Sequence, residues 1–194
     1  MEEPRVPNAL ADEDIDTYED MDGADPAVLF GIVYRRLSGA VLGYLRARGV
    51  DDPEAVTQDV FLAFFPKIGD LSGGIQGAKS LVFSIAHARM VDHYRRRERA
   101  PDFSPYDAAA DTRSSASAED QALGQAAIGG ASVLLEGLSG EHREVLALRV
   151  VADLSIEQVA GIMGKSPGAV KQLQRRALCN LRDQTLRRNK ADHG

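Results

Sequence analysis

The chain has 194 residues, of which 44% are hydrophobic and 27% are charged, an ordinary composition for a soluble globular protein. Its single cysteine, Cys179, excludes an internal disulfide. We find no apolar run close to the ~20 residues that cross a membrane, and the acidic N-terminus lacks the apolar segment of a signal peptide. We therefore expect a cytoplasmic protein without membrane insertion.

The formal net charge of −6 is unevenly distributed along the chain. Residues 1–28 contain ten acidic residues and one basic residue, whereas the rest of the chain carries a net charge of +3. Residues 1–25 also contain few large apolar side chains, so we expect an acidic disordered tail. Nucleic-acid binding must then be sought in local basic clusters and not in the charge of the whole chain.

Residues 26–99 are expected to form the first of two small helical domains. Apolar residues recur every three or four positions from Leu29 to Leu45, as in a helix with one buried face, and Gly49 should end this helix. The sequence Asp-Asp-Pro at residues 51–53 is typical of the start of a second helix. The expected fold class is therefore all-α.

The second helix should end at about Phe65, because Pro66 breaks the pattern. The glycines of residues 69–77 predict a loop, and a third helix is expected over residues 78–98. One apolar stripe of this third helix should face the core, while its remaining face is basic. Basic side chains beside aromatic ones suit contact with an opened DNA strand, although a solvated, arginine-rich helix end gives the same pattern.

Residues 100–132 are rich in Ala, Ser, Asp, Pro and Gly, and they predict a flexible linker with a short helix near residues 118–127. The second domain is expected over residues 133–188, followed by a tail over residues 189–194. Its first helix should span residues 140–150, with Ser139 as the N-cap residue.

Two further capping signals define a helix-turn-helix in the second domain. Ser155 and Gln158 form a capping-box pattern that opens a short helix over residues 156–163, and Gly164 should end it. Ser166 is then an N-cap residue before a long helix that begins at Pro167. A short helix, a tight turn and a longer helix are the elements of a DNA-binding helix-turn-helix.

The last helix has an apolar face and a small or basic face when its residues are placed at about 100° intervals. The apolar face should pack against the preceding helix, and its residues are Ala169, Val170, Leu173, Ala177 and Leu181. The opposite face begins where a recognition helix meets bases and phosphates. Its candidate DNA-binding residues are Ser166, Gly168, Lys171, Gln172, Arg175 and Arg176. A solvated amphipathic helix is the alternative interpretation.

Enzyme chemistry finds little support in the sequence. His87 and His93 are six residues apart on one helix, so their side chains point about 120° apart and cannot share a metal ion. The glycine pair at Gly73 and Gly74 lacks the strand and the lysine of a phosphate-binding loop. We therefore expect no enzyme, no catalytic residues, no metal site and no cofactor.

Both predicted domains resemble the extracytoplasmic-function (ECF) sigma factors, which keep regions two and four of the sigma-70 family. Residues 51–65, DDPEAVTQDVFLAFF, are similar to the region-two helix that docks on the clamp helices of the largest polymerase subunit. Residues 84–97, SIAHARMVDHYRRR, are similar to the helix that reads the −10 element. Residues 138–182 are similar to region four, which reads the −35 element.

The resemblance implies a factor that binds core RNA polymerase and directs promoter recognition, DNA opening and transcription initiation. The residues that it implies for polymerase binding are Gln58, Asp59, Phe61 and Leu62. Those that it implies for the −10 element are Lys79, His87, Arg89, His93, Arg96 and Arg97, beside a base pocket formed partly by the loop at residues 69–78. The implied partners are the clamp helices of the largest polymerase subunit, the flap of the second-largest subunit, promoter DNA and an anti-sigma factor.

Two other functions stay open. Ala55, Leu81 and Ala88 stand where the family often has an acid, Trp and Asn. These departures allow a sigma-like decoy that binds only an anti-sigma factor. The other alternative is a dimeric helix-turn-helix repressor, which would bind a palindrome without polymerase.

Overall fold

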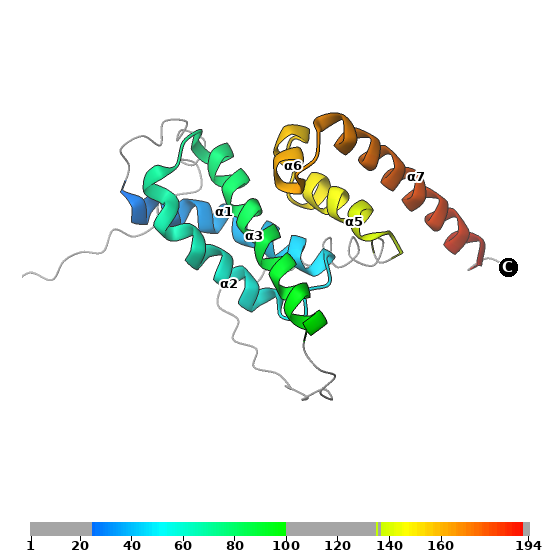
Figure 1. Cartoon of the computed structure of the whole chain (residues 1–194), viewed down its shortest axis with the longest axis horizontal. Coiled ribbons are helices and arrows are strands. Elements are labelled where there is room, and N and C mark those ends of the chain that lie inside the picture. The colour runs from blue at the N-terminus through cyan, green and yellow to red at the C-terminus, as the bar shows by residue number, and fades with distance from the viewer. Residues whose placement is uncertain (1–24, 100–134, 136, 192–194) are drawn as a thin grey trace, which may run out of the picture.

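The computed structural model describes residues 25–99, 135 and 137–191, and every element in these ranges is a helix (Figure 1). The expected all-α fold class is therefore confirmed. The acidic tail up to residue 24, the linker over residues 100–132 and the short helix at residues 118–127 lie outside the described residues. The domain boundaries stay predictions.

The first group of helices, called the first module here, lies within residues 26–99. It contains α1 (Pro26–Ala47), α2 (Pro53–Phe64), the 3-10 helix η2 (Phe65–Asp70) and α3 (Gly74–Arg99). Carboxylates cap the first two helices: Asp25 accepts a hydrogen bond from the Ala27 amide at 2.8 Å, and Asp52 accepts one from the Ala55 amide at 3.0 Å. These caps satisfy amide groups that have no partner within the helix, so they fix where α1 and α2 begin.

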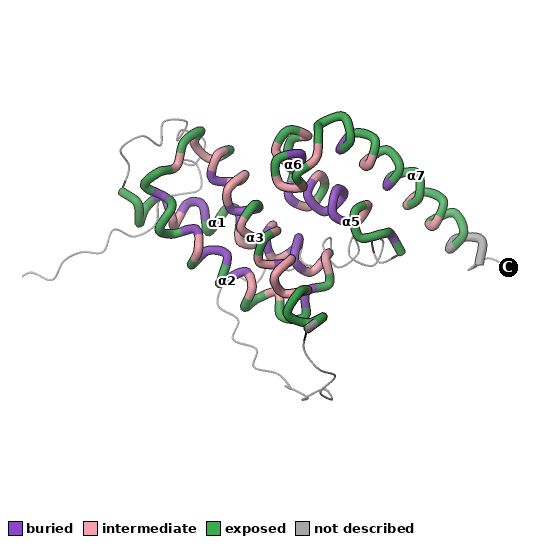
Figure 2. The backbone as a smooth tube through the Cα atoms, viewed as in Figure 1, coloured by how far each residue is buried: buried purple, intermediate pink, exposed green. Residues whose placement is uncertain are grey.

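The core of the first module lies between α1, α2 and α3, which contact one another (Figure 2). Its largest fully buried side chains are aromatic, and Tyr44 of α1 meets Phe83 of α3 edge to face with ring centroids 5.8 Å apart. Burial of a phenylalanine side chain stabilises a fold by about 1.5–3 kcal/mol, so these aromatic residues hold the helices together.

Helix α1 is long and apolar enough by composition to cross a membrane, although Arg35 and Arg36 interrupt its apolar sequence. The helix has 22 residues, and a large part of it is buried inside the protein. Its apolar residues Val33, Val41 and Leu45 belong to the core. Core helices of globular proteins can be equally long and apolar, so the composition of α1 gives only weak support for a membrane span.

Helix α3 begins at Gly74, four residues before the predicted start, so the predicted loop over residues 69–77 is largely wrong. Gly73 and Gly74 have φ values of +80° and +57°, and they turn the chain directly into the helix. Gly77 then lies inside the first turn, with its amide bonded to the Gly73 carbonyl at 2.9 Å. A Cβ at position 77 would lie 1.9 Å from the Ser72 carbonyl oxygen, so this glycine answers a close backbone approach and does not mark a loop.

The Gly77→Ala variant should lower the free energy of unfolding by about 2 kcal/mol, because the Ser72 backbone must move to admit a methyl group. Gly39 in α1 is the matched control, since a Cβ there would meet nothing within 4 Å. Gly39→Ala should raise the free energy of unfolding by about 0.5–1 kcal/mol. Denaturant unfolding followed by circular dichroism measures both changes, and equal stabilities for the two variants would contradict this account of Gly77.

The second group of helices, called the second module, lies within residues 137–191. It contains α5 (Gly140–Leu146), the π-helix η3 (Ala147–Val151), α6 (Ile156–Met163) and α7 (Pro167–Ala191). Ser139 stands at the N-cap of α5 but makes no side-chain capping bond, contrary to expectation. Instead, the Arg143 guanidinium donates hydrogen bonds to the Leu135 and Leu138 carbonyls at 3.0 and 3.3 Å and ties the preceding segment to the helix.

The start of α6 agrees with the sequence prediction. Ser155 Oγ accepts from the Gln158 amide at 3.2 Å, and Gln158 Oε1 accepts from the Ser155 amide at 2.7 Å, so the capping box is confirmed. Gly164 ends α6 with φ +62°, in the left-handed region that favours glycine. Ser166 Oγ then accepts from the Ala169 amide at 3.2 Å, at the start of α7. Helix α7 runs to Ala191, past the predicted end at residue 188.

The two modules lie side by side and contact each other (Figure 1). Residues of η3 contact α1, and residues of α6 contact α3. The end of α7 extends away from the first module (Figure 1). The surface of α3 therefore divides into a part that meets the second module and a part that does not.

Candidate nucleic-acid interface

The first turns of α7 carry the predicted −35-reading residues, and all six of them are exposed: Ser166, Gly168, Lys171, Gln172, Arg175 and Arg176. On the opposite side of the helix, Val170 and Ala177 are buried and Leu173 is half-buried. Ala169 differs from expectation because it is exposed. The expected division into an apolar and a basic face therefore holds, except at Ala169.

The packing of α6 against α7 presents this basic face outward. Val159 of α6 is fully buried, and α6 contacts α7 directly. Gly164 ends α6 in the left-handed conformation, and Ser166 caps the start of α7. These two residues therefore define the turn and the direction in which α7 leaves it. The result is a helix-turn-helix whose second helix offers three cationic side chains to solvent, as a helix that enters the major groove requires.

Glu157 of α6 marks one border of this basic face. Hydrogen bonds from its own backbone amide and from Ser155 lower the pKa of Glu157, and the nearby Lys171 charge lowers it further. The carboxylate is therefore charged at neutral pH. Its negative charge would repel an anion at this border, whereas the cationic Arg175 and Arg176 would attract one.

Helix α3 brings the six predicted −10-reading residues onto one helix. Arg96 and Arg97 are exposed near its C-terminal end. The other four, Lys79, His87, Arg89 and His93, are half-buried. The loop over residues 69–78, which was expected to form part of a base pocket, is shorter than predicted. Only residues 71–73 separate η2, which ends at Asp70, from α3, which begins at Gly74.

Four of these six side chains lie against carboxylates. Asp51, two residues before α2, is 2.8 Å from Arg97 Nη1 and 3.4 Å from His93 Nε2. The other two carboxylates belong to the second module: Asp153 is 3.4 Å from Lys79 Nζ, and Glu144 is 2.9 Å from His87 Nδ1. This surface of α3 is therefore already occupied by negative charge.

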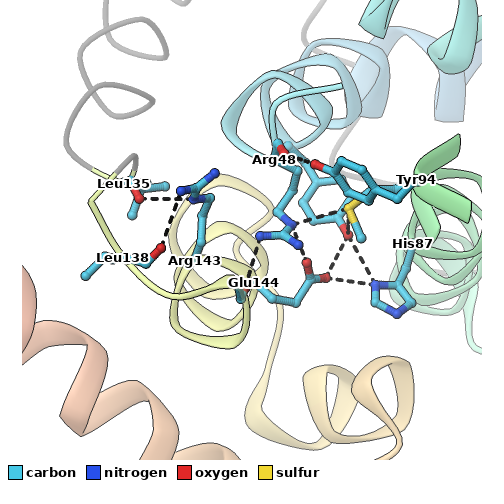
Figure 3. A network of polar contacts seen from close by, with 10 residues as sticks. Arg48, His87, Tyr94, Leu135, Leu138, Arg143 and Glu144 are labelled. Carbon is cyan, nitrogen blue, oxygen red and sulfur yellow. Dashed lines mark hydrogen bonds and ion pairs between the residues drawn. The ribbon is translucent and has the colours of Figure 1, made fainter. Parts of the chain in front are cut away.

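Glu144 is the centre of a buried network that sequence reasoning missed (Figure 3). Its side chain is on α5, and the residue is 4% exposed. The Tyr44 hydroxyl donates to Glu144 Oε1 at 2.7 Å, and Arg48 Nε lies 2.6 Å from Oε2. The Tyr94 hydroxyl donates to the Arg48 carbonyl and so ties α3 to the same group. Burial and the Glu144 charge raise the pKa of Tyr44 well above its ordinary value, so this hydroxyl stays protonated and remains a donor.

A third surface lies on α2, where the polymerase-binding residues are predicted. Gln58 and Asp59 are exposed, and Leu62 is 72% exposed. The prediction that Phe61 binds polymerase directly is wrong, because Phe61 is 2% exposed and lies beneath this surface. Phe65, which was not predicted, is 50% exposed one turn after Leu62.

Aromatic contacts join this surface of α2 to α1. Phe30 meets Phe65 edge to face at 5.3 Å between ring centroids, and Tyr34 meets Phe61 at 4.8 Å. Tyr34 is itself 43% exposed. An exposed apolar patch with polar residues at its rim is typical of a protein-binding surface. Phe65 is the first residue of η2, and the adjacent phenylalanines at 64 and 65 do not by themselves show in the sequence which ring is exposed.

Comparisons with known proteins find similar sequences among RNA polymerase sigma factors. Residues 134–183 match the family model for sigma-70, region 4. The chain is 32% identical over 132 residues to the ECF RNA polymerase sigma factor ShbA of Streptomyces griseus, covering 66% of this chain and 69% of that protein. It is 26% identical over 160 residues to the ECF RNA polymerase sigma factor BldN of Streptomyces coelicolor, covering 81% of this chain. The match spans only 61% of BldN.

A solved structure shares the fold. In the structure of CnrH in complex with the cytosolic domain of CnrY, one chain matches with a TM-score of 0.56 and 22% sequence identity. The match covers 80% of this chain and 86% of that one. At this level of identity the likeness concerns the fold alone.

Proposed function

The chain belongs to the ECF sigma factors of the sigma-70 family, and from this membership we propose that it binds core RNA polymerase and directs it to promoters. In this proposal the chain acts without covalent chemistry, in the cytoplasm, and its work is recognition. Region four would hold the −35 duplex, and region two would capture an opened −10 strand.

The observation that carries the proposal is the presence on one chain of two separate, exposed surfaces of different chemistry, one basic and one apolar. The basic face of α7 suits a DNA duplex, because Lys171 and Arg175 can neutralise phosphate or read guanine and Gln172 can read adenine. The apolar patch on α2, centred on Leu62 and Phe65, suits a protein. A factor that links polymerase to promoter needs both.

The proposed partners follow from these surfaces. The α2 patch would dock on the clamp helices of the largest polymerase subunit, and the second module would also meet the flap of the second-largest subunit. The basic residues of α3 and α7 would contact promoter DNA. We also propose an anti-sigma partner, on the ground of family membership.

Copurification with core polymerase tests the proposal. The tagged chain should elute with all core subunits in a stable equimolar complex on size-exclusion chromatography. Absence of that complex, together with a dimer that binds palindromic DNA, would favour the repressor alternative. Leu62→Asp is the negative control for this experiment, because it changes only the exposed patch on α2. Deleting residues 51–65 would also remove core residues and unfold the first module.

A further inference from the structure

The loop between α1 and α2 is held against the C-terminal end of α3 (Figure 1). The amides of Gly49 and Val50 donate to carbonyls in the last turn of α1 at 2.9 and 3.1 Å, and Val50 is buried. The Tyr94 hydroxyl of α3 donates to the Arg48 carbonyl at the start of the same loop. Asp51, which follows Val50, is therefore presented to α3 from a fixed backbone.

The carboxylate of Asp51 faces α3 and does not cap α2. The cap is supplied by the next residue, Asp52, whose side chain accepts from the Ala55 amide at 3.0 Å. Both carboxylate oxygens of Asp51 lie 2.8 Å from Arg97 Nη1, and one of them lies 3.4 Å from His93 Nε2. One carboxylate thus holds two side chains that are assigned to the −10 element.

The contact leaves Arg97 able to bind a second group. Asp51 takes only Nη1, whereas a guanidinium also carries donors on Nε and Nη2 in the same rigid plane. The Arg97 side chain is 63% exposed, so these donors can be reached from solvent. A free arginine side chain samples many rotamers, and a ligand must immobilise it. A carboxylate that already fixes the plane reduces this cost for a phosphate bound at Nε and Nη2.

Stability alone does not explain the pair. The side chains of Asp51 and Arg97 are 59% and 63% exposed, and ion pairs between exposed side chains contribute little to the free energy of unfolding. The negative charge of Asp51 would by itself repel a DNA phosphate. The contact therefore favours DNA binding only if the orientation of Arg97 outweighs this repulsion.

We propose that Asp51 is a positioning residue for the −10 strand: it holds Arg97 in the orientation in which Nε and Nη2 bind a strand phosphate. The inference rests on the proposed function, since it needs α3 to contact an opened strand. Because Asp52 begins α2, the same loop also fixes the end of α3 relative to the helix that is proposed to dock on polymerase. The loop thereby sets the position of the bound strand relative to the docking surface.

Asp51→Asn tests the proposal, because it keeps the side-chain size and removes the charge that holds Arg97. The full chain is assembled with core polymerase, and the probe is a fluorescent promoter fragment at which this holoenzyme initiates, with its −10 segment left unpaired. Asp51→Asn should bind the probe about fivefold more weakly, although a negative charge has been removed. Arg97→Ala should also lose about fivefold, and the double variant should bind no more weakly than Arg97→Ala alone.

Glu54→Gln is the matched control. Glu54 lies three residues beyond Asp51, is 55% exposed and pairs with Arg46 of α1 instead of with α3. The substitution therefore removes one paired negative charge from the same part of the first module without touching Arg97. Its affinity for the probe should stay within about twofold of the unchanged chain, because exposed charges are screened by salt.

Unchanged or higher affinity in Asp51→Asn would overturn the proposal and would leave Asp51 as a neutralising charge. An equal loss with and without Arg97 would also overturn it, because Asp51 would then act through the fold. If circular dichroism shows that Asp51→Asn is unfolded, Asp51→Glu, which shifts the carboxylate by one methylene, takes its place in the same comparison. Failure of the unchanged chain to assemble with core polymerase or to initiate would reject the proposed function itself, whereas the preceding results reject only the role of Asp51.

Discussion

Core RNA polymerase should bind the Leu62→Asp variant about 100-fold more weakly than the unchanged chain, a loss of about 2.7 kcal/mol. Leu62 is the most exposed apolar residue on α2, beside the half-exposed Phe65. A carboxylate at its position both removes apolar contact and must be desolvated in the complex. Titration of labelled chain with core polymerase, followed by fluorescence anisotropy, gives the change.

Leu186→Asp is the matched control for this prediction. Leu186 is 62% exposed, compared with 72% for Leu62, but it lies near the far end of α7. In a titration with the isolated clamp helices of the largest subunit, which the second module is not proposed to contact, its substitution should leave binding within about twofold, within the scatter expected for a distant surface change. Equal losses in the two variants would show that added charge, and not the α2 patch, weakens binding.

Asp59 lies at the polar rim of the same patch. The Asp59→Arg variant should weaken core binding less than Leu62→Asp and should do so mainly at low salt, because charges at an exposed rim act through screened, long-range attraction. Unchanged holoenzyme assembly in Asp59→Arg would remove Asp59 from the docking surface.

Transcription from a promoter with a −35 element should fall about tenfold in each of Lys171→Ala and Arg175→Ala, since a lost base contact costs ~1–3 kcal/mol. Both side chains are exposed at the start of α7, on the face opposite Val170 and Ala177. A residue that contacts phosphate instead should reduce the salt dependence of DNA binding by about one unit of slope. Transcript yields and binding at two salt concentrations separate these two kinds of contact.

Arg187→Ala is the control on the same helix. Arg187 is exposed and lies twelve residues beyond Arg175, about 18 Å further along the axis. Its removal should leave transcription unchanged, and promoters whose −35 element is mutated should be insensitive to all three substitutions. Equal losses with and without a −35 element would point to misfolding of the second module.

Local signals predicted much of this fold, because each depends on residues close in the sequence. The capping box at Ser155 and Gln158, the left-handed Gly164 and the start of α7 at Pro167 were all readable in this way. The start of α3 could not be predicted from local signals. Its glycines suggested a loop, but Gly77 is required by the approach of the Ser72 carbonyl, which only the folded backbone reveals.

Contacts between distant segments explain the other misses. Phe61 matched a docking motif, yet its place on the helix turns it into the core, while Phe65 reaches the surface. Glu144 looked like an ordinary helical charge, because its partners Tyr44 and His87 are 100 and 57 residues away in the sequence. Periodicity shows which face of a helix is apolar, but it cannot show which other module will cover the polar one.

Transcription by purified core polymerase, with the chain as its only initiation factor and fragmented genomic DNA as template, tests the central claim most directly. Sequencing of the RNA 5′ ends should reveal new start sites that share −10 and −35 elements, and these starts should disappear when Leu62→Asp replaces the unchanged chain. An absence of new start sites, although the chain binds core polymerase, would contradict the account and would favour a sigma-like decoy.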